Sequence, residues 1–189
     1  MRRLFIPLLL LSLAPAPSMA QANVQIRQGF GISFGLGFGS AGLDCDGCDF
    51  DRETGLSGYL RIGGYVRPNL FIAGETNGWV HSEDGLDEQI SFLSAVAQWY
   101  PQVATGFYLK GGLGLAVSAA EDAFDELSAS GMGLTLGTGY DWRVGRNFSL
   151  TPYLNYLRAF GAEAELNGVG LGENLSTNVL QFGLGFTWH

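Results

Sequence analysis

The sequence predicts an all-β fold, namely an eight-stranded antiparallel up-and-down transmembrane β-barrel. Three observations predict it. Eight segments alternate apolar with small or polar residues, short and long connections alternate between these segments, and acidic residues gather in the long connections. After the N-terminus no segment shows a sustained helical period or approaches the ~20 apolar residues that a spanning helix needs. A tilted strand crosses a bilayer with only ~9–11 residues, which every alternating segment supplies.

The first residues are expected to lie outside this fold. Residues 1–20 begin with a basic pair, continue with an apolar run, and end in small residues at Ala20. This order is typical of a secretory signal peptide, with cleavage after Ala22 fitting nearly as well. The barrel domain is therefore expected to occupy residues 21–189.

The strands are expected, in order, at 26–39, 56–67, 70–81, 89–100, 106–118, 130–143, 148–160 and 178–189. Three connections are short and rich in Pro, Gly and Asn, which is the chemistry of tight turns: 67–69, 101–105 and 144–147. Four connections are longer: 40–55, 82–88, 119–129 and 161–177. Such alternation is typical of hairpins whose two ends face different compartments.

The two faces of the strands differ in chemistry. The last strand sets an apolar face that runs from Leu180 to Trp188 against Gln181, Gly183, Gly185 and Thr187. The first, fifth and sixth strands repeat this pattern. The third, fourth and seventh are less clean, and 89–100 carries apolar residues on both faces. A face exposed to bulk water should be rich in Lys and Glu, whereas the polar face of these strands consists mainly of Gly, Ser, Thr and Tyr. We therefore expect the polar face to line the lumen and the apolar face to meet lipid.

Charge and aromatic residues are polarised along the barrel. The net charge is −8, which argues against nucleic acid as a partner. Sixteen of the 18 acidic residues fall in the long connections, whereas Arg67, Arg143 and Arg146 lie at the short-turn end. Aromatic residues gather at that same end and are expected to form an interfacial girdle: Phe71, Trp99, Tyr100, Phe107, Tyr140, Trp142, Phe148, Phe186 and Trp188.

Four charged residues fall on lumen-facing positions: Arg61, Glu75, Lys110 and Asp141. Because a lone charge is costly in a low-dielectric interior, we expect them to pair. They could form an ionic plug or line a narrow ion path. The plug is favoured, since an eight-stranded interior is only wide enough to be filled by side chains. Glycine-lined strands leave space that Tyr59, Tyr65, Trp79, Trp99 and Tyr153 could fill.

The first long connection contains the sequence DCDGCDFD. Cys45 and Cys48 are expected to form a disulfide after export to an oxidising compartment. The four aspartates offer low-affinity Ca²⁺ or Mg²⁺ binding, or simply a solvated acidic loop: Asp44, Asp46, Asp49 and Asp51. The EF-hand spacing fails, because Gly55 stands where the closing Glu should be. No other cofactor is expected.

The chain resembles the small eight-stranded bacterial outer-membrane barrels of the OmpX and OmpA membrane-domain type. The resemblance covers nearly the whole mature chain and rests on strand count, loop asymmetry and the closing segment NVLQFGLGFTWH. Such barrels usually end on an aromatic residue that the assembly machinery reads, whereas here His189 follows Trp188. The resemblance implies periplasmic short turns and termini, extracellular acidic loops, a monomer, and outer-membrane lipid and the barrel-assembly machinery as partners.

The resemblance brings no catalytic motif, so we expect a non-enzymatic protein with a structural or surface-interaction role through its acidic loops. A narrow porin-like channel is the alternative. A lipid-modifying enzyme built on His81 and Ser82, beside Glu83, is less favoured. Adjacent strand residues point to opposite faces, which disfavours a direct nucleophile–base pair.

Overall fold

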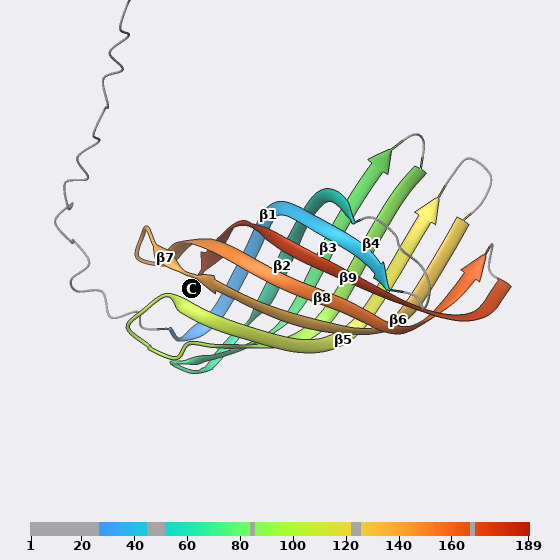
Figure 1. Cartoon of the computed structure of the whole chain (residues 1–189). Coiled ribbons are helices and arrows are strands. Elements are labelled where there is room, and N and C mark those ends of the chain that lie inside the picture. The colour runs from blue at the N-terminus through green and yellow to red at the C-terminus, as the bar shows by residue number, and fades with distance from the viewer. Residues whose placement is uncertain (1–26, 45–51, 84–85, 122–125, 167–168) are drawn as a thin grey trace, which may run out of the picture.

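The computed structural model describes residues 27–44, 52–83, 86–121, 126–166 and 169–189. Antiparallel β-strands account for almost all of them (Figure 1). The strands are β1 (Gly29–Asp44), β2 (Glu53–Arg67), β3 (Leu70–Glu83), β4 (Leu86–Trp99), β5 (Phe107–Glu121), β6 (Glu126–Tyr140), β7 (Trp142–Arg143), β8 (Phe148–Leu166) and β9 (Val169–Trp188). Within the described residues, no helix is long and apolar enough to cross a membrane.

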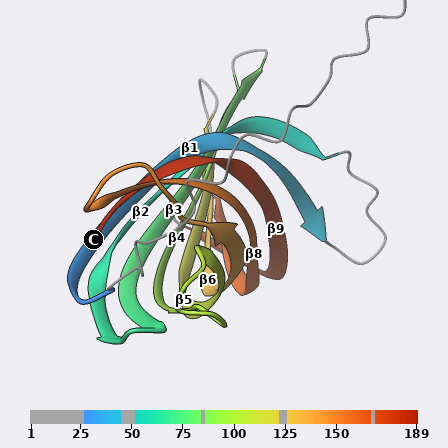
Figure 2. The ribbon, with the colours of Figure 1, turned by 90° about the vertical axis from the view of Figure 1, so that its left-hand side faces the viewer.

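The sheet closes on itself into a barrel. Its strand order is β6-β5-β4-β3-β2-β1-β9-β8-β7, and β6 pairs in addition with β8. Only Asp141 separates β6 from β7, and both pair with β8, so they act as one wall strand. The barrel therefore has eight antiparallel walls, as predicted, and Figure 2 shows them curving around a common interior. The continuous strand predicted at 130–143 is instead interrupted at Asp141.

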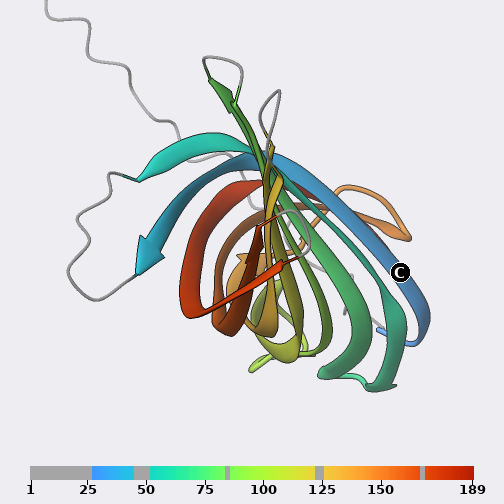
Figure 3. The same cartoon turned by 90° about the vertical axis from the view of Figure 1, so that its right-hand side faces the viewer.

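The strands extend further into the long connections than the sequence predicts. For example, β1 continues to Asp44 and β2 begins at Glu53, and the β3–β4 ladder runs out to the pair Glu83 and Leu86. The acidic residues Glu53, Glu83, Asp87 and Glu88 therefore lie on strand ends rather than in loops. We call this end of the barrel the wide end, where the β3–β4 and β5–β6 hairpins project in Figure 3. The end with the three short turns is the narrow end.

The predicted faces are confirmed. Phe34, Leu36 and Phe38 of β1 are exposed on the outer surface, as are Phe182 and Leu184 of β9 beside them. In the unclear fourth strand, Phe92, Ser94, Val96 and Gln98 are buried, whereas Leu93 and Trp99 are exposed. β8 corresponds to the predicted seventh strand, and its buried side chains include Ser149, Thr151, Tyr153, Asn155 and Leu157. The structure therefore shows which face of the fourth and of the seventh strand points into the barrel.

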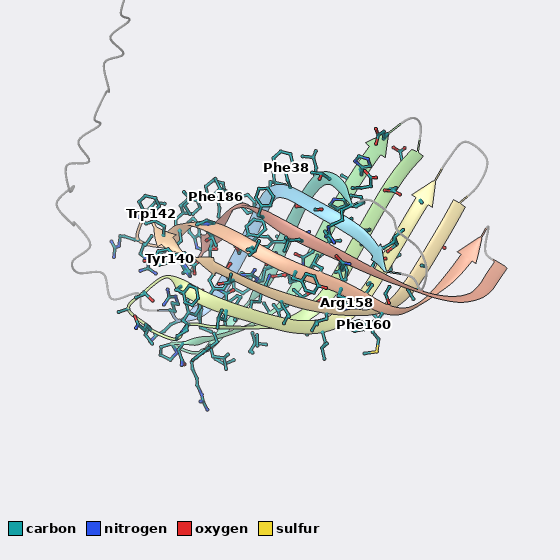
Figure 4. All side chains as sticks on the ribbon, in the orientation of Figure 1. Phe38, Tyr140, Trp142, Arg158, Phe160 and Phe186 are labelled. Atoms are coloured by element: carbon teal, nitrogen blue, oxygen red, sulfur yellow. The ribbon has the colours of Figure 1, made fainter. Side chains whose placement is uncertain are left out.

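The narrow-end aromatic residues divide between the two faces. Trp142, Tyr140 and Phe186 project from the outer surface near this end in Figure 4, and Trp142 and Tyr140 are 63% and 46% exposed. This supports an interfacial girdle. Phe71 and Tyr100 are instead buried inside the barrel, so their assignment to the girdle is wrong. Position in the sequence marks the level of a residue along the barrel, but only the phase of its strand marks the face.

Interior glycines make room for aromatic rings from neighbouring strands. A Cβ atom on Gly35 would lie 2.5 Å from the Tyr59 ring, and one on Gly39 would lie 2.7 Å from the Trp79 ring. Tyr59, Trp79 and Tyr153 are all buried, so they fill the lumen as predicted. Trp99 is the exception, because it points outward and is 47% exposed. Alternating small and large side chains therefore pack this narrow interior.

The lipid-facing assignment predicts a depth-dependent cost of added charge. Leu36 lies in the middle of β1 and is 75% exposed. We expect Leu36→Arg to reduce the free energy of unfolding in lipid vesicles by about 2–4 kcal/mol, measured by urea titration. The matched change Val144→Arg, in the turn before β8, should cost under about 1 kcal/mol, because a charge there reaches the interface. Equal costs at both positions would contradict lipid contact at Leu36.

Candidate functional site

The centre of the barrel holds a compact ion cluster on three strands, β2, β3 and β5. Arg61 on β2 and Glu75 on β3 are direct cross-strand partners, and Arg61 Nε donates to Glu75 Oε2 at 2.5 Å. Lys110 on β5 reaches past β4 and donates to both Glu75 oxygens, at 2.6 and 2.8 Å. Asn77 Nδ2 also donates to Glu75 Oε1, at 2.8 Å. Two cations thus share one carboxylate.

All members of this cluster are withdrawn from solvent. Arg61, Glu75 and Lys110 are each at most 4% exposed. The guanidinium of Arg61 lies 4.9 Å from the centre of the Tyr59 ring, and Lys110 Nζ lies 5.6 Å from the same ring. Charges in such surroundings are tolerated only when paired and hydrogen-bonded, as these are. The cluster therefore occupies the lumen as packed structure.

Asp141, the fourth predicted residue, joins the cluster through a chain of hydrogen bonds. Arg61 Nη1 donates to Gln98 Oε1, and Gln98 Nε2 donates to the Tyr100 hydroxyl at 2.5 Å. Tyr100 in turn donates to Asp141 Oδ2 at 2.6 Å. The structure thus brings Arg61, Glu75 and Lys110 into direct contact and links Asp141 through Gln98 and Tyr100.

A second chain of hydrogen bonds reaches Asp141 from its other side, through the neighbouring strands β8, β9, β1 and β2. Thr151 donates to Asp141 Oδ1 at 2.8 Å. A hydroxyl has one proton, so Thr187, 3.0 Å away, donates to Thr151. By the same count Ser33 donates to Thr187, and Tyr59 donates to Ser33, each at 2.8 Å. Both chains therefore end on one carboxylate, and with Glu75 and Lys110 they include side chains from all eight walls.

The narrow end carries a further buried group. Arg27 donates to the carbonyls of Val103 and Thr105 at 2.9 and 2.7 Å, and its guanidinium stacks 3.7 Å above the Tyr100 ring. His189 lies between Tyr65 and Ser149, with its ring nitrogens 2.9 and 3.0 Å from their hydroxyls. Burial lowers the pKa of His189 to about 4, so its imidazole is neutral at neutral pH. These contacts hold Arg27 and His189 in hydrogen-bonded positions at the narrow end.

The wide end is open by comparison. A cavity of about 170 Å³ lies above Trp79 and Ile90, and small residues such as Ala41, Ala119 and Ala129 line it. Glu53 lies on its wall, close to His81 and Glu83, and these three side chains form a cluster. His81 stacks on the ring of Trp79, whereas its neighbour Ser82 is exposed.

The other predicted site falls largely outside the described residues. Cys45 and Cys48 lie outside them, as do Asp46, Asp49 and Asp51. Asp44 ends β1, and its side chain is not among those described. The disulfide and the Ca²⁺ or Mg²⁺ site remain predictions.

Sequence reasoning missed the residues that join the two halves of the interior. Gln98 was missed because the fourth strand has apolar residues on both faces, so the sequence did not show which face points into the lumen. Tyr100 was assigned to the girdle because it lies at the right level. The signal that could have found them is the alternation Ser94, Val96, Gln98, which continues to Tyr100 and is buried throughout.

Comparisons with known proteins agree with this geometry. A family model described as "Outer membrane protein beta-barrel domain" matches residues 6–187, nearly the whole chain. No curated protein matches the chain.

Several solved barrels have a similar fold. Neisserial surface protein A is 16% identical, with a TM-score of 0.58, over 85% of this chain and 96% of its own. Ail, the attachment invasion locus protein of Yersinia pestis, is 14% identical, with a TM-score of 0.60, over 85% of this chain and 99% of its own. A major outer membrane protein from Thermus thermophilus is 14% identical, with a TM-score of 0.51, over 85% of this chain and 98% of its own. At such identities the likeness concerns the fold alone.

Because Arg61 and Lys110 share the carboxylate of Glu75, we expect a large loss of stability when this carboxylate is neutralised. Glu75→Gln keeps the shape of the side chain but leaves Arg61 and Lys110 buried without a counter-charge. We expect the free energy of unfolding to fall by about 3–5 kcal/mol, measured by denaturant titration in detergent micelles. The control Asp87→Asn, at an exposed position, should change it by under about 0.5 kcal/mol. A loss below about 1 kcal/mol for Glu75→Gln would mean that the cluster does not stabilise the barrel.

Proposed function

The chain belongs to the outer membrane protein beta-barrel domain family, and within that family we propose that it acts as a closed, non-conducting and non-enzymatic barrel. Its role is structural or one of surface interaction. The barrel is an anchor in the outer membrane, and the wide end presents the long acidic hairpins to the outside. The short turns of the narrow end face the periplasm.

The interior network carries this proposal. Arg61, Glu75 and Lys110 fill the middle of the lumen, and the two hydrogen-bonded chains that end on Asp141 fill the level toward the narrow end. An ion could pass only by displacing buried side chains from charge-assisted hydrogen bonds, which are among the strongest in proteins. A plug therefore fits these contacts better than the alternative of a narrow channel.

A buried network of this kind also supports a non-enzymatic role. Arg61, Glu75 and Lys110 face one another, and each is nearly inaccessible to a substrate. At the wide end His81 and Ser82 occupy successive positions of β3, so their side chains point to opposite faces. A nucleophile and its base must lie within hydrogen-bond reach, which this arrangement does not offer.

Charge asymmetry supports the orientation. Glu53, Glu83, Asp87 and Glu88 lie on strand ends at the wide end. Arg67, Arg143 and Arg146 lie at the narrow end. Long connections on the outer side and short turns on the periplasmic side are the usual arrangement in outer-membrane barrels.

Conductance tests the plug. We expect the refolded protein to produce no steps in a planar bilayer, with insertion verified by its β-sheet circular dichroism in matched vesicles. A truncating double change, Tyr59→Ala with Arg61→Ala, removes two large lumen side chains and should produce a measurable conductance if it folds. Reproducible conductance steps from the unmodified protein would overturn the plug in favour of the channel.

Surface labelling tests the orientation. In a Cys45→Ser/Cys48→Ser background, a single cysteine is placed at exposed Ser82 near the wide end or at exposed Gln102 in a short turn. A maleimide coupled to a polymer too large to cross the outer membrane should label Ser82→Cys on intact cells. It should label Gln102→Cys only after permeabilisation. The reverse pattern would invert the proposed topology.

A further inference from the structure

A cluster of three metal-ligating side chains lies on the wide end, apart from the buried network. Glu53 begins β2, and His81 and Glu83 lie at the end of β3. His81 Nε2 is 3.5 Å from Glu53 Oε2 and 3.4 Å from Glu83 Oε2, and all three ligand atoms lie within 4.8 Å of one another. We propose that Glu53, His81 and Glu83 form a binding site for a divalent transition-metal ion, with Zn²⁺ as its representative.

The spacing of the ligand atoms fits a small tetrahedral ion. Zinc binds imidazole nitrogen and carboxylate oxygen at about 2.0–2.2 Å, so tetrahedral ligands lie about 3.4 Å from one another. The two separations from His81 Nε2 already have this value. The two carboxylates need only a small approach, and they are free to make it, since their side chains are 47% and 70% exposed.

The imidazole of His81 is held in place by the buried ring of Trp79. Its ring stacks on that of Trp79, with the centroids 5.9 Å apart and the planes at 20°. Trp79 is 2% exposed and donates from its indole Nε1 to the carbonyl of Gly39 at 2.9 Å. A ligand whose orientation is set by buried neighbours loses little freedom when it binds a metal ion.

The local charge favours a cation. Glu53 and Glu83 supply two carboxylates, and the cross-strand partner of His81 is a third acid, Glu88 on β4. The nearest cation in sequence, Arg52, is engaged elsewhere, because it donates to Ser40 and Asn178. A divalent ion would relieve the repulsion between the carboxylates.

The ligand set selects the class of ion. Ca²⁺ and Mg²⁺ prefer oxygen ligands alone, whereas an imidazole nitrogen with two carboxylates suits Zn²⁺ and its neighbours in the first transition row. Three protein ligands leave a fourth position for water. This site therefore differs in residues and in chemistry from the aspartate-rich segment that ends at Asp51.

Calorimetry on the full mature chain in detergent micelles at about pH 7.5 tests the proposal, in a Cys45→Ser/Cys48→Ser background that removes the thiols. We expect saturable binding of one Zn²⁺ per chain, and weaker or no binding of Ca²⁺. His81→Gln and Glu83→Gln should each weaken Zn²⁺ binding by about tenfold or more. Glu83 is largely exposed, so its variant should retain the fold even if the His81 variant does not. The matched control Asp87→Asn, on the same hairpin, should leave the affinity unchanged.

A spectroscopic measurement identifies the ligands. Co²⁺ bound in place of Zn²⁺ should give the intense visible absorption of a tetrahedral site, and His81→Gln should abolish it. If Zn²⁺ gives no saturable heat, or binds equally well to the Glu83→Gln and parent proteins, the proposal is wrong. The three side chains would then form only a surface cluster of an imidazole with two carboxylates.

Discussion

The closure of the sheet is the constraint on which the rest of the structure depends. In hydrocarbon an unpaired backbone N–H or C=O costs several kcal/mol, so a sheet in lipid cannot leave an open edge. The pairing of β6 with β8 removes the last edge. Once eight walls close, every second side chain points into a lumen only wide enough for the side chains themselves. The interior must therefore pack and pair, whatever else the protein does.

That interior solves two problems with neighbouring residues. Glycines such as Gly35 admit the ring of Tyr59, so the lumen is filled without overlap. Glu75 neutralises part of the charge of Arg61 and Lys110, and a chain of hydrogen bonds connects Arg61 to the second carboxylate, Asp141. A single buried charge would be costly, whereas a network in which each member is bonded is tolerated. The result is a packed centre and narrow end, whereas the cavity and the cluster of Glu53, His81 and Glu83 lie at the wide end.

Much of the fold was predictable, because lipid on one side of the sheet and a filled lumen on the other impose an alternation of apolar with small or polar residues along each strand. The prediction failed where the two faces of a strand no longer differ in this way. Beyond the bilayer both faces of a strand meet water, so the alternation carries no information, and the strands continue to Asp44 and Glu83 undetected. In β4 both faces are apolar, because Phe92 and Val96 pack inside while Leu93 meets lipid. Only neighbouring strands decide between these two phases.

The sequence alone placed Arg61 and Glu75 on lumen-facing positions of two strands joined by the short turn at 67–69, and the structure makes them direct cross-strand partners. Lys110 belongs to a hairpin two strands away along the wall, and its contact with Glu75 exists because the wall curves. Asp141 meets Tyr100 in the same way, because β5 lies between the strands that carry these two residues. Local pattern thus decides which face a side chain occupies, whereas the curvature and closure of the barrel decide which residues it meets across the interior.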